Sequence, residues 1–371
     1  MALTNFAALT AEQKIVWSRD VWKEAREKAF ITKFTGTGEG SMIQRVTELT
    51  KTEKGEKVLM HLLADLVGDG IVGDNEREGH EEEMMTYTDD ITIDLISHGV
   101  RQKGKLADQK TVVSFREHSR DRLSYWLANR MDQLAFLTLS GIGYDKNLDG
   151  SARANSAFTQ LAFAADVSAP SANRHFNITG DGTGYTGLAA GDTATIDANA
   201  LLTYEAIVDI MTQVNRSYMK SLMGGGKDYY IGFISPEGLA QLKKDPDFQR
   251  AVITGLPRSE ENPFFSGGIV TVDGLVLHPH RYVYNTKGAT SGVDKWGAGS
   301  AIDGSRMLIC GAQALGMADL GQPEWAEKWF NYNSSPGVNV DKMFGLLKPK
   351  FHSIHSNSTE DFGVIAINHT I

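Results

Sequence analysis

The longest uninterrupted helical pattern in the chain runs from Lys105 to Ser140. This stretch contains no Pro and no Gly, and Gly141 follows it where a helix stop is expected. Apolar residues recur at steps of three and four and share one face: Val112, Phe115, Leu123, Trp126, Leu127, Met131, Leu134 and Leu137. Charged residues, Asp132 among them, occupy the other positions. At 1.5 Å per residue the helix would be about 50 Å long. Such length predicts a structural spine, and a core helix of a large enzyme is the alternative.

Composition narrows the function classes. The 371 residues are 41% hydrophobic and 22% charged, which is enough to bury a sizeable core. The net charge of −9 disfavours a protein that grips nucleic acid through its phosphates, but not one that encloses it. A single cysteine, Cys310, excludes an intrachain disulfide and fits a reducing compartment. We therefore expect a soluble globular protein.

The N-terminal segment predicts a docking helix. Residues 10–30 form an amphipathic pattern capped by Thr10, and Trp17 and Trp22 lie within it. A terminal helix with such side chains packs on its own core or on a neighbouring chain. The start of the chain has no signal-peptide pattern, and no run of 18 apolar residues predicts a membrane span.

Residues 43–104 predict β structure in the form of an arm. Two apolar runs, 56–68 and 89–102, flank a segment rich in Gly and acidic residues. We interpret this as a long two-stranded arm with an acidic tip. Its apolar strands would be poorly buried if the arm stood alone, which predicts a partner surface.

The rest of the chain indicates a mixed fold. The low-charge tract 142–200 predicts a loop or small β excursion on the surface, too rich in small residues for a core. A second amphipathic helix covers 201–220, with Tyr218 on its apolar face, which we expect to be buried. A buried strand covers 229–235. Ser235-Pro236 predicts a helix start, and Asp273-Gly274 a hairpin turn. A strand at 306–318 and two C-terminal strands follow. Without a βαβ repeat, the fold class is α+β.

No motif assembles a catalytic site. Asp145 to Gly150 matches half of an EF-hand loop, but Ser156 replaces its final Glu, so a plain turn is favoured. The glycine runs at 180–184 and 224–228 fit neither a dinucleotide fingerprint nor a P-loop. His278 and His280 lack ligand partners at metal spacing and predict surface imidazoles. Cys310 predicts an inert core thiol. We expect no catalysis, no cofactor and no metal.

In the order of its segments the chain resembles the major capsid proteins of tailed bacteriophages, which have the Hong Kong 97-type fold, and more narrowly the coat proteins of N-four-like podophages. Residues 34–58 (FTGTGEGSMIQRVTELTKTEKGEKV), 67–84 (VGDGIVGDNEREGHEEEM) and 93–111 (IDLISHGVRQKGKLADQKT) carry the first half of the resemblance. The second half comprises 121–141 (DRLSYWLANRMDQLAFLTLSG), 234–249 (ISPEGLAQLKKDPDFQ), 262–280 (NPFFSGGIVTVDGLVLHPH) and 310–315 (CGAQAL). The series is collinear and covers most of the chain.

The resemblance implies a division of the chain into family elements. Residues 1–45 would be the N-arm, and 46–104 the extended hairpin called the E-loop with its flanking strands. Residues 105–199 would hold the spine helix of the peripheral P-domain and the loop tract after it. The axial A-domain would span 200–338, and 339–371 would return to P-domain strands.

The resemblance also implies partners and place. Hexamers and pentamers of the chain would form an icosahedral shell that encloses double-stranded DNA without binding it specifically. A scaffolding protein, a portal protein and a decoration or cement protein would be further partners, with no membrane. The shell would belong to the virion and be assembled in the cytoplasm of the bacterial host. Covalent crosslinking through Lys51, Lys54 or Lys57 has no supporting pattern.

Contacts between subunits are predicted from charge. The acidic arm segment should face basic residues of a neighbouring spine helix, and the alternative is a solvated loop tip. The acidic candidates are Asp74, Glu76, Glu78, Glu81, Glu82 and Glu83. The basic candidates are Arg116, Arg120 and Arg122, and Trp17 and Trp22 are apolar candidates. Two other functions are also considered: a cargo-enclosing nanocompartment of the same fold, and a soluble metal- or glycan-binding enzyme.

Overall fold

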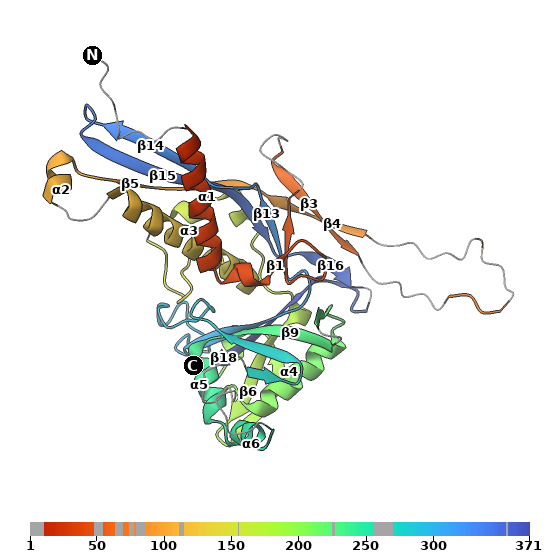
Figure 1. Ribbon diagram of the computed structural model, residues 1–371. Coiled ribbons are helices and arrows are strands. Elements are labelled where there is room, and N and C mark those ends of the chain that lie inside the picture. Colours follow the sequence, from red (N-terminus) through yellow and green to blue (C-terminus); the bar gives the residue numbers. More distant parts are fainter. Residues whose placement is uncertain are drawn as a thin grey trace, which may run out of the picture.

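Two large β-sheets joined by a long helix dominate the described fold, and two separate two-stranded sheets accompany them. The computed structural model describes residues 11–47, 55–63, 70–73, 78, 86–110, 115–154, 156–224, 227–255, 270–353 and 355–371. Figure 1 shows the first sheet with helices α1 (Ala11–Lys28) and α3 (Phe115–Ser140) in the upper part of the view. The second sheet lies below with α4 (Tyr204–Arg216), α5 (Pro236–Lys244) and α6 (Pro246–Gly255). The α+β prediction is confirmed.

The first sheet is built around one long strand, β15 (Ser335–Leu347). Among the described residues, β13 (Leu315–Asp319), β14 (Glu324–Phe330) and β5 (Asp94–Arg101) all pair antiparallel with β15. The parallel strands β2 (Ile43–Val46) and β1 (Thr35–Gly36) extend the sheet beyond β13. Segments from both ends of the chain therefore meet in one sheet. The short helices η1 (Ile31–Phe34) and α2 (Lys105–Lys110) precede β1 and follow β5.

The second sheet contains both parallel and antiparallel strand pairs. Its order among the described residues is β10-β11-β9-β12-β18-β6-β7, with β8 pairing β9. The strands are β6 (His175–Asp181), β7 (Gly184–Ala190), β8 (Leu222–Gly224), β9 (Lys227–Ile234), β10 (Val270–Val272), β11 (Leu275–Pro279), β12 (Gly304–Cys310) and β18 (Val364–Thr370). Both faces of β12 and β18 are covered, so every residue of these two strands is buried. Leu308 faces the core around α3, whereas Met307 and Ile309 face the core that includes α4 and α5.

The predicted spine is helical where the structure describes it. Residues 105–110 form α2 and 115–140 form α3, and 111–114 lie outside the described residues. Gly141 ends α3 with a φ of +66°, and the Ile142 N–H donates to the Leu137 carbonyl. The C-terminal half of α3 is buried nearly all round because both sheets and α1 surround it. The one-face prediction therefore holds only for its N-terminal half.

The tract 142–200 differs from its prediction. It does contain a small β excursion, the β6–β7 hairpin, and the short helices η2 (Ser156–Gln160), η3 (Ala162–Ala164), η4 (Ala172–Arg174) and η5 (Thr193–Thr195). It is not confined to the surface, because Phe163 and Ile178 are buried in the two main cores. Most residues of this tract are small, and its few large apolar side chains, such as Phe163 and Ile178, pack into the two cores.

Sheet membership does not follow the predicted boundaries at 199/200 and 338/339. The β6–β7 hairpin and β18, assigned to the P-domain, pair in the same sheet as β9 and β12 of the predicted A-domain. Conversely, β13 and β14 lie in the first sheet although they fall within 200–338. The C-terminal region also holds three strands rather than two, since β16 (Lys350–Ser353) and β17 (Ser358–Asp361) form a separate hairpin before β18.

The helix start and the hairpin turn predicted in the second half of the chain are confirmed. The Ser235 hydroxyl accepts a hydrogen bond from the Gly238 N–H at 3.1 Å, which caps α5 as predicted. Asp273 and Gly274 adopt φ values of +48° and +80° between β10 and β11, the conformation of a type I′ hairpin turn. The helix predicted over 201–220 is shorter, and Tyr218, expected on its buried face, is 68% exposed beyond its end.

Candidate inter-subunit surfaces

The predicted two-stranded arm is present at its base. Strand β3 (Lys57–Leu63) pairs antiparallel with β4 (Thr86–Thr92) on one flank of the molecule (Figure 1). The base of the arm does not stand alone, because other parts of the subunit cover its strands. Met60 and Ile91 are buried in a small core with Phe362. The run predicted as the second arm strand also divides: β4 belongs to the arm, whereas β5 joins the first sheet.

Only part of the acidic segment between β3 and β4 lies within the described residues. Glu78 is exposed there, and Val72 is 80% exposed. The other acidic candidates lie outside the described residues: Asp74, Glu76, Glu81, Glu82 and Glu83. Their pairing with a neighbour therefore stays a prediction.

The basic candidates on α3 are not equivalent. The Arg120 guanidinium pairs with Asp121 at 3.1 Å and lies over the Trp17 ring at 5.5 Å, so it already has partners within the subunit. Arg122 is exposed, and the side chain of Arg116 lies outside the described residues. Arg122 is the member of this set that the described structure leaves accessible.

The two tryptophans of α1 dock on the subunit's own core. The ring of Trp17 lies 5.7 Å from that of Trp325. Trp22 is 7% exposed, and the Lys342 ammonium lies 4.0 Å from its ring centroid. Of the two alternatives, packing on its own core holds for this helix. Trp22 is therefore covered within its own subunit, and its contact with a neighbouring subunit stays a prediction.

A cationic surface at the end of the first sheet was missed by sequence reasoning. Arg101, Lys103 and Lys105 are exposed where β5 leads into α2. Exposed Lys328 lies beside them, because both it and Arg101 cover the ring of Phe330, at 5.3 and 4.2 Å. The signal was the run RQKGK at 101–105. We call Arg101, Lys103, Lys105 and Lys328 the cationic edge.

The turn between β14 and β15 adds an exposed aromatic ring near this edge. Asn331, Tyr332 and Asn333 all have φ between +49° and +61°, a region that Asn tolerates and Tyr rarely adopts. Tyr332 is fully exposed. Strained backbone that holds out a large side chain is typical of contact sites.

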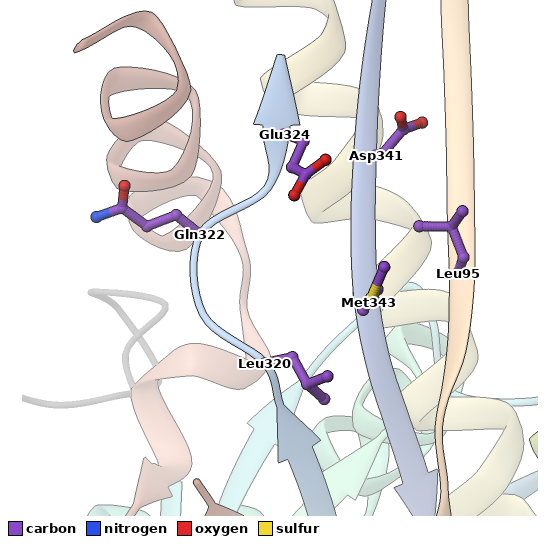
Figure 2. Close-up of a pocket in the computed structure, with 6 residues that line it drawn as sticks. All are labelled: Leu95, Leu320, Gln322, Glu324, Asp341 and Met343. Atoms are coloured by element: carbon purple, nitrogen blue, oxygen red, sulfur yellow. The ribbon is translucent and has the colours of Figure 1, made fainter. Parts of the chain in front are cut away.

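A shallow pocket lies on the outer face of the first sheet (Figure 2). Leu95, Leu320 and Met343 supply its apolar atoms, and the polar lining residues are Gln322, Glu324 and Asp341. Its volume of about 60 Å³ is far below the ~300–1,000 Å³ of small-molecule sites. It can accept the end of one side chain, but it cannot enclose a substrate.

The sequence motifs with possible chemistry are structural in the described residues. Asp149 accepts hydrogen bonds from the backbone N–H and hydroxyl of Ser151, and Lys146 pairs with Asp294, so 145–150 is a closed turn. No group of three potential metal-ligating side chains occurs in the described part of the chain. Burial raises the pKa of the Cys310 thiol, which keeps it protonated. No helix in that part is long and apolar enough to cross a membrane.

The prediction of surface imidazoles at His278 and His280 is wrong. The His280 ring stacks on Phe30 at 4.1 Å and on Phe136 at 5.1 Å, and burial lowers its pKa to about 4. His278 lies edge-on to Phe34 at 5.1 Å. Both rings are half-buried because the segment after α1 packs over them, a long-range contact that local sequence does not reveal.

Asp132 fastens the end of α1 to α3. It is 4% exposed, and its carboxylate accepts hydrogen bonds from the backbone N–H groups of Phe30 at 2.9 Å and Ile31 at 3.1 Å. Burial raises the pKa of Asp132 to about 6, against the opposing effect of these two donors. The helical pattern had placed Asp132 on the charged face, whereas its function is to satisfy the free N–H groups at the start of η1.

The burial of Asp132 predicts that Asp132→Asn changes the free energy of unfolding by an amount that depends on pH. The folded pKa lies above the unfolded value of about 3.9, so the bound proton stabilises the fold at low pH, and this stabilisation is lost as pH rises through about 6. Between about pH 5 and 7.5, the unfolding free energy of the variant relative to the native chain should rise by about 1 kcal/mol. Urea unfolding at both pH values measures this. Glu117→Gln, at an exposed position of the same helix, is the control, and a pH-independent difference for Asp132→Asn would contradict the raised pKa of Asp132.

Comparison with known proteins places the chain. The phage capsid protein family matches residues 5–371. The major capsid protein of Pseudomonas phage KPP25 is 48% identical over 366 residues, which covers 98% of this chain and 96% of that protein. The capsid of Ralstonia phage GP4 superposes with a TM-score of 0.72 at 27% identity, over 100% of this chain and 95% of that one.

A more distant structure shares the fold alone. The capsid of cyanophage Pam1 matches with a TM-score of 0.68 at 18% identity, over 100% of this chain and 96% of that one. The predicted Hong Kong 97-type capsid fold is confirmed by these matches. Because the matches span nearly the whole of each protein, the chain belongs to the phage capsid protein family, as a major capsid protein.

Proposed function

We propose that this chain assembles as pentamers and hexamers into an icosahedral shell that encloses the double-stranded DNA of a tailed phage. The observation that carries the proposal is the 48% identity, over nearly full lengths, with a phage major capsid protein. The chain's net charge of −9 supports enclosure without tight binding, since a shell that must let DNA enter and leave should not hold its phosphates.

The division into family elements is part of this proposal. Residues 1–45 act as the N-arm and 46–104 as the E-loop with its flanking strands. Sheet membership supports a revised division of the rest. The spine helix with β13, β14 and β15 forms the P-domain, and the second sheet with α4, α5 and α6 forms the A-domain.

Assembly in the host cytoplasm requires a scaffolding protein, and the finished virion adds a portal and a decoration protein. Sedimentation velocity of the purified chain, with and without a candidate scaffolding protein, tests this requirement. We expect shells of uniform size only with the scaffold. Uniform shells from the chain alone would show that assembly needs no scaffolding protein, and the proposed shell function would still stand.

The acidic segment of residues 74–83 contacts basic side chains of a neighbouring subunit. Arg120 is already paired within its own subunit, which favours Arg122 and the cationic edge as the neighbour's surface. Each exposed pair contributes only about 0.2–1 kcal/mol, but a shell repeats it in every subunit.

Charge reversal at Glu81, Glu82 and Glu83 to Lys should impair shell assembly and leave the subunit folded. Like charges would then meet across the contact. Electron microscopy counts the shells, and circular dichroism melting checks the fold. Adding Lys103→Glu and Lys105→Glu to the triple variant should restore assembly, whereas shells from the triple variant at the native yield would refute the contact.

A further inference from the structure

The connection between the two sheets contains a fully buried cluster of four charged side chains. The chain leaves the first sheet after Leu347 and enters the second at Val364. Lys348 lies at the start of this connection, and Glu360 and Asp361 lie near its end on β17. Arg174, in the turn η4 before β6, completes the cluster, and all four side chains are at most 5% exposed.

The turn that carries Arg174 donates hydrogen bonds to the carboxylates of both Glu360 and Asp361. The Arg174 Nε donates to Glu360 Oε2 at 2.9 Å, and the Asn173 amide donates to Glu360 Oε1 at 2.9 Å. The Ser171 N–H donates to Asp361 Oδ2 at 3.1 Å, and the Lys348 ammonium donates to the same oxygen at 2.9 Å. These contacts fasten η4, which carries Arg174, to β17, which carries Glu360 and Asp361.

Three buried polar atoms of this cluster remain unpaired with any described residue. They are the Nη1 and Nη2 atoms of Arg174 and the Oδ1 atom of Asp361. Ser171 links the two groups, because its N–H donates to Asp361 Oδ2 at 3.1 Å and its carbonyl accepts from the Arg174 N–H at 2.9 Å. Leaving such groups without partners in a core is costly, and native proteins satisfy them with protein atoms or ordered water.

The chemistry of these atoms defines the ligand. It must accept hydrogen bonds from a guanidinium and donate one to a carboxylate, so a simple anion or cation satisfies only one side. Within the cluster, the two cations Arg174 and Lys348 pair with the two anions Glu360 and Asp361. Water meets both requirements and is the usual occupant of buried polar sites.

We propose that the joint between the two sheets binds an internal water that accepts from the Arg174 guanidinium and donates to Asp361 Oδ1. The water completes the link between η4 and β17. It extends the polar network of Arg174, Lys348, Glu360 and Asp361, which holds the two sheets in one fixed relation.

A cryo-EM reconstruction of the assembled shell, at a resolution that shows ordered water, tests the site. We expect a single water-sized density about 2.7–3.2 Å from an Nη atom of Arg174 and from Asp361 Oδ1 in every copy of the subunit. Direct contact of the guanidinium with Asp361 Oδ1, absence of density between them, or a larger polyatomic density would overturn the proposal.

Two variants sharpen the test. Glu360→Gln removes a charge beside Arg174 but no ligand of the water, so its map should retain the density. Arg174→Lys keeps the charge but removes both Nη donors, so its map should lose the density at this position. Loss in Glu360→Gln or retention in Arg174→Lys counts against the site. If Arg174→Lys does not assemble, the native and Glu360→Gln maps still decide.

Discussion

A chain that ends at Gly363 is expected to yield neither a folded subunit nor shells. The missing strand β18 lies inside the second sheet, where Gly304–Cys310 pairs with it on one side and His175–Asn177 on the other. All its residues from Val364 to Thr370 are buried. Its removal opens both main cores, because Val364 and Ala366 face one and Ile365 and Ile367 face the other.

The size of this effect follows from ordinary core energetics. Truncating one large buried aliphatic side chain costs about 2–5 kcal/mol, and a domain's whole stability is about 5–15 kcal/mol. The loss of a buried strand therefore exceeds what the fold can tolerate. Solubility, size-exclusion chromatography and electron microscopy of the truncated chain measure the outcome. Removing Ile371 alone, a half-buried residue beyond the strand, is the control and should leave assembly intact. Shells from the chain ending at Gly363 would contradict this topology.

The substitution Trp22→Ala is expected to destabilise the subunit by about 3–5 kcal/mol. The indole is buried between α1, α3 and the first sheet, and it also lies against the Lys342 ammonium. Its loss leaves a cavity and removes the partner ring from a buried cation that is otherwise held by Asp319 at the inner face of β15.

Thermal unfolding and limited proteolysis measure this effect. The first cleavage in Trp22→Ala should fall in α1, because that helix loses its main anchor. Val16→Ala is the matched control, since Val16 is 50% exposed on the same helix and should change stability by less than about 0.5 kcal/mol. Equal melting temperatures for the two variants would show that α1 is not held by its tryptophans.

Local chemistry made several elements predictable. Gly141 ends α3, Ser235 caps α5 and Asp273-Gly274 closes a hairpin because each depends on a few neighbouring atoms. The antiparallel pairing of β3 with β4 also followed from two apolar runs around a polar segment. The resemblance to tailed-phage coat proteins rested on the order of such segments, and the comparisons confirm it.

Long-range pairing was not predictable from these patterns. Nothing near Val364 shows that it enters a sheet between β12 and β6, and nothing near His280 shows that Phe30 stacks on it. Asp132 was placed on an exposed face because helical periodicity records polarity, not the backbone donors that a buried carboxylate satisfies. The contacts that Arg120 and Trp22 make within their own subunit were not predictable from local sequence either: Arg120 pairs with Asp121, and Trp22 is buried.

Electron microscopy of the purified chain, alone and with a candidate scaffolding protein, is the decisive test of whether it assembles into icosahedral shells. We expect closed shells tens of nanometres across, or rings of five and six subunits. In an icosahedral reconstruction, residues 57–92 should contact a neighbouring subunit. A monodisperse monomer under every condition would contradict this assembly.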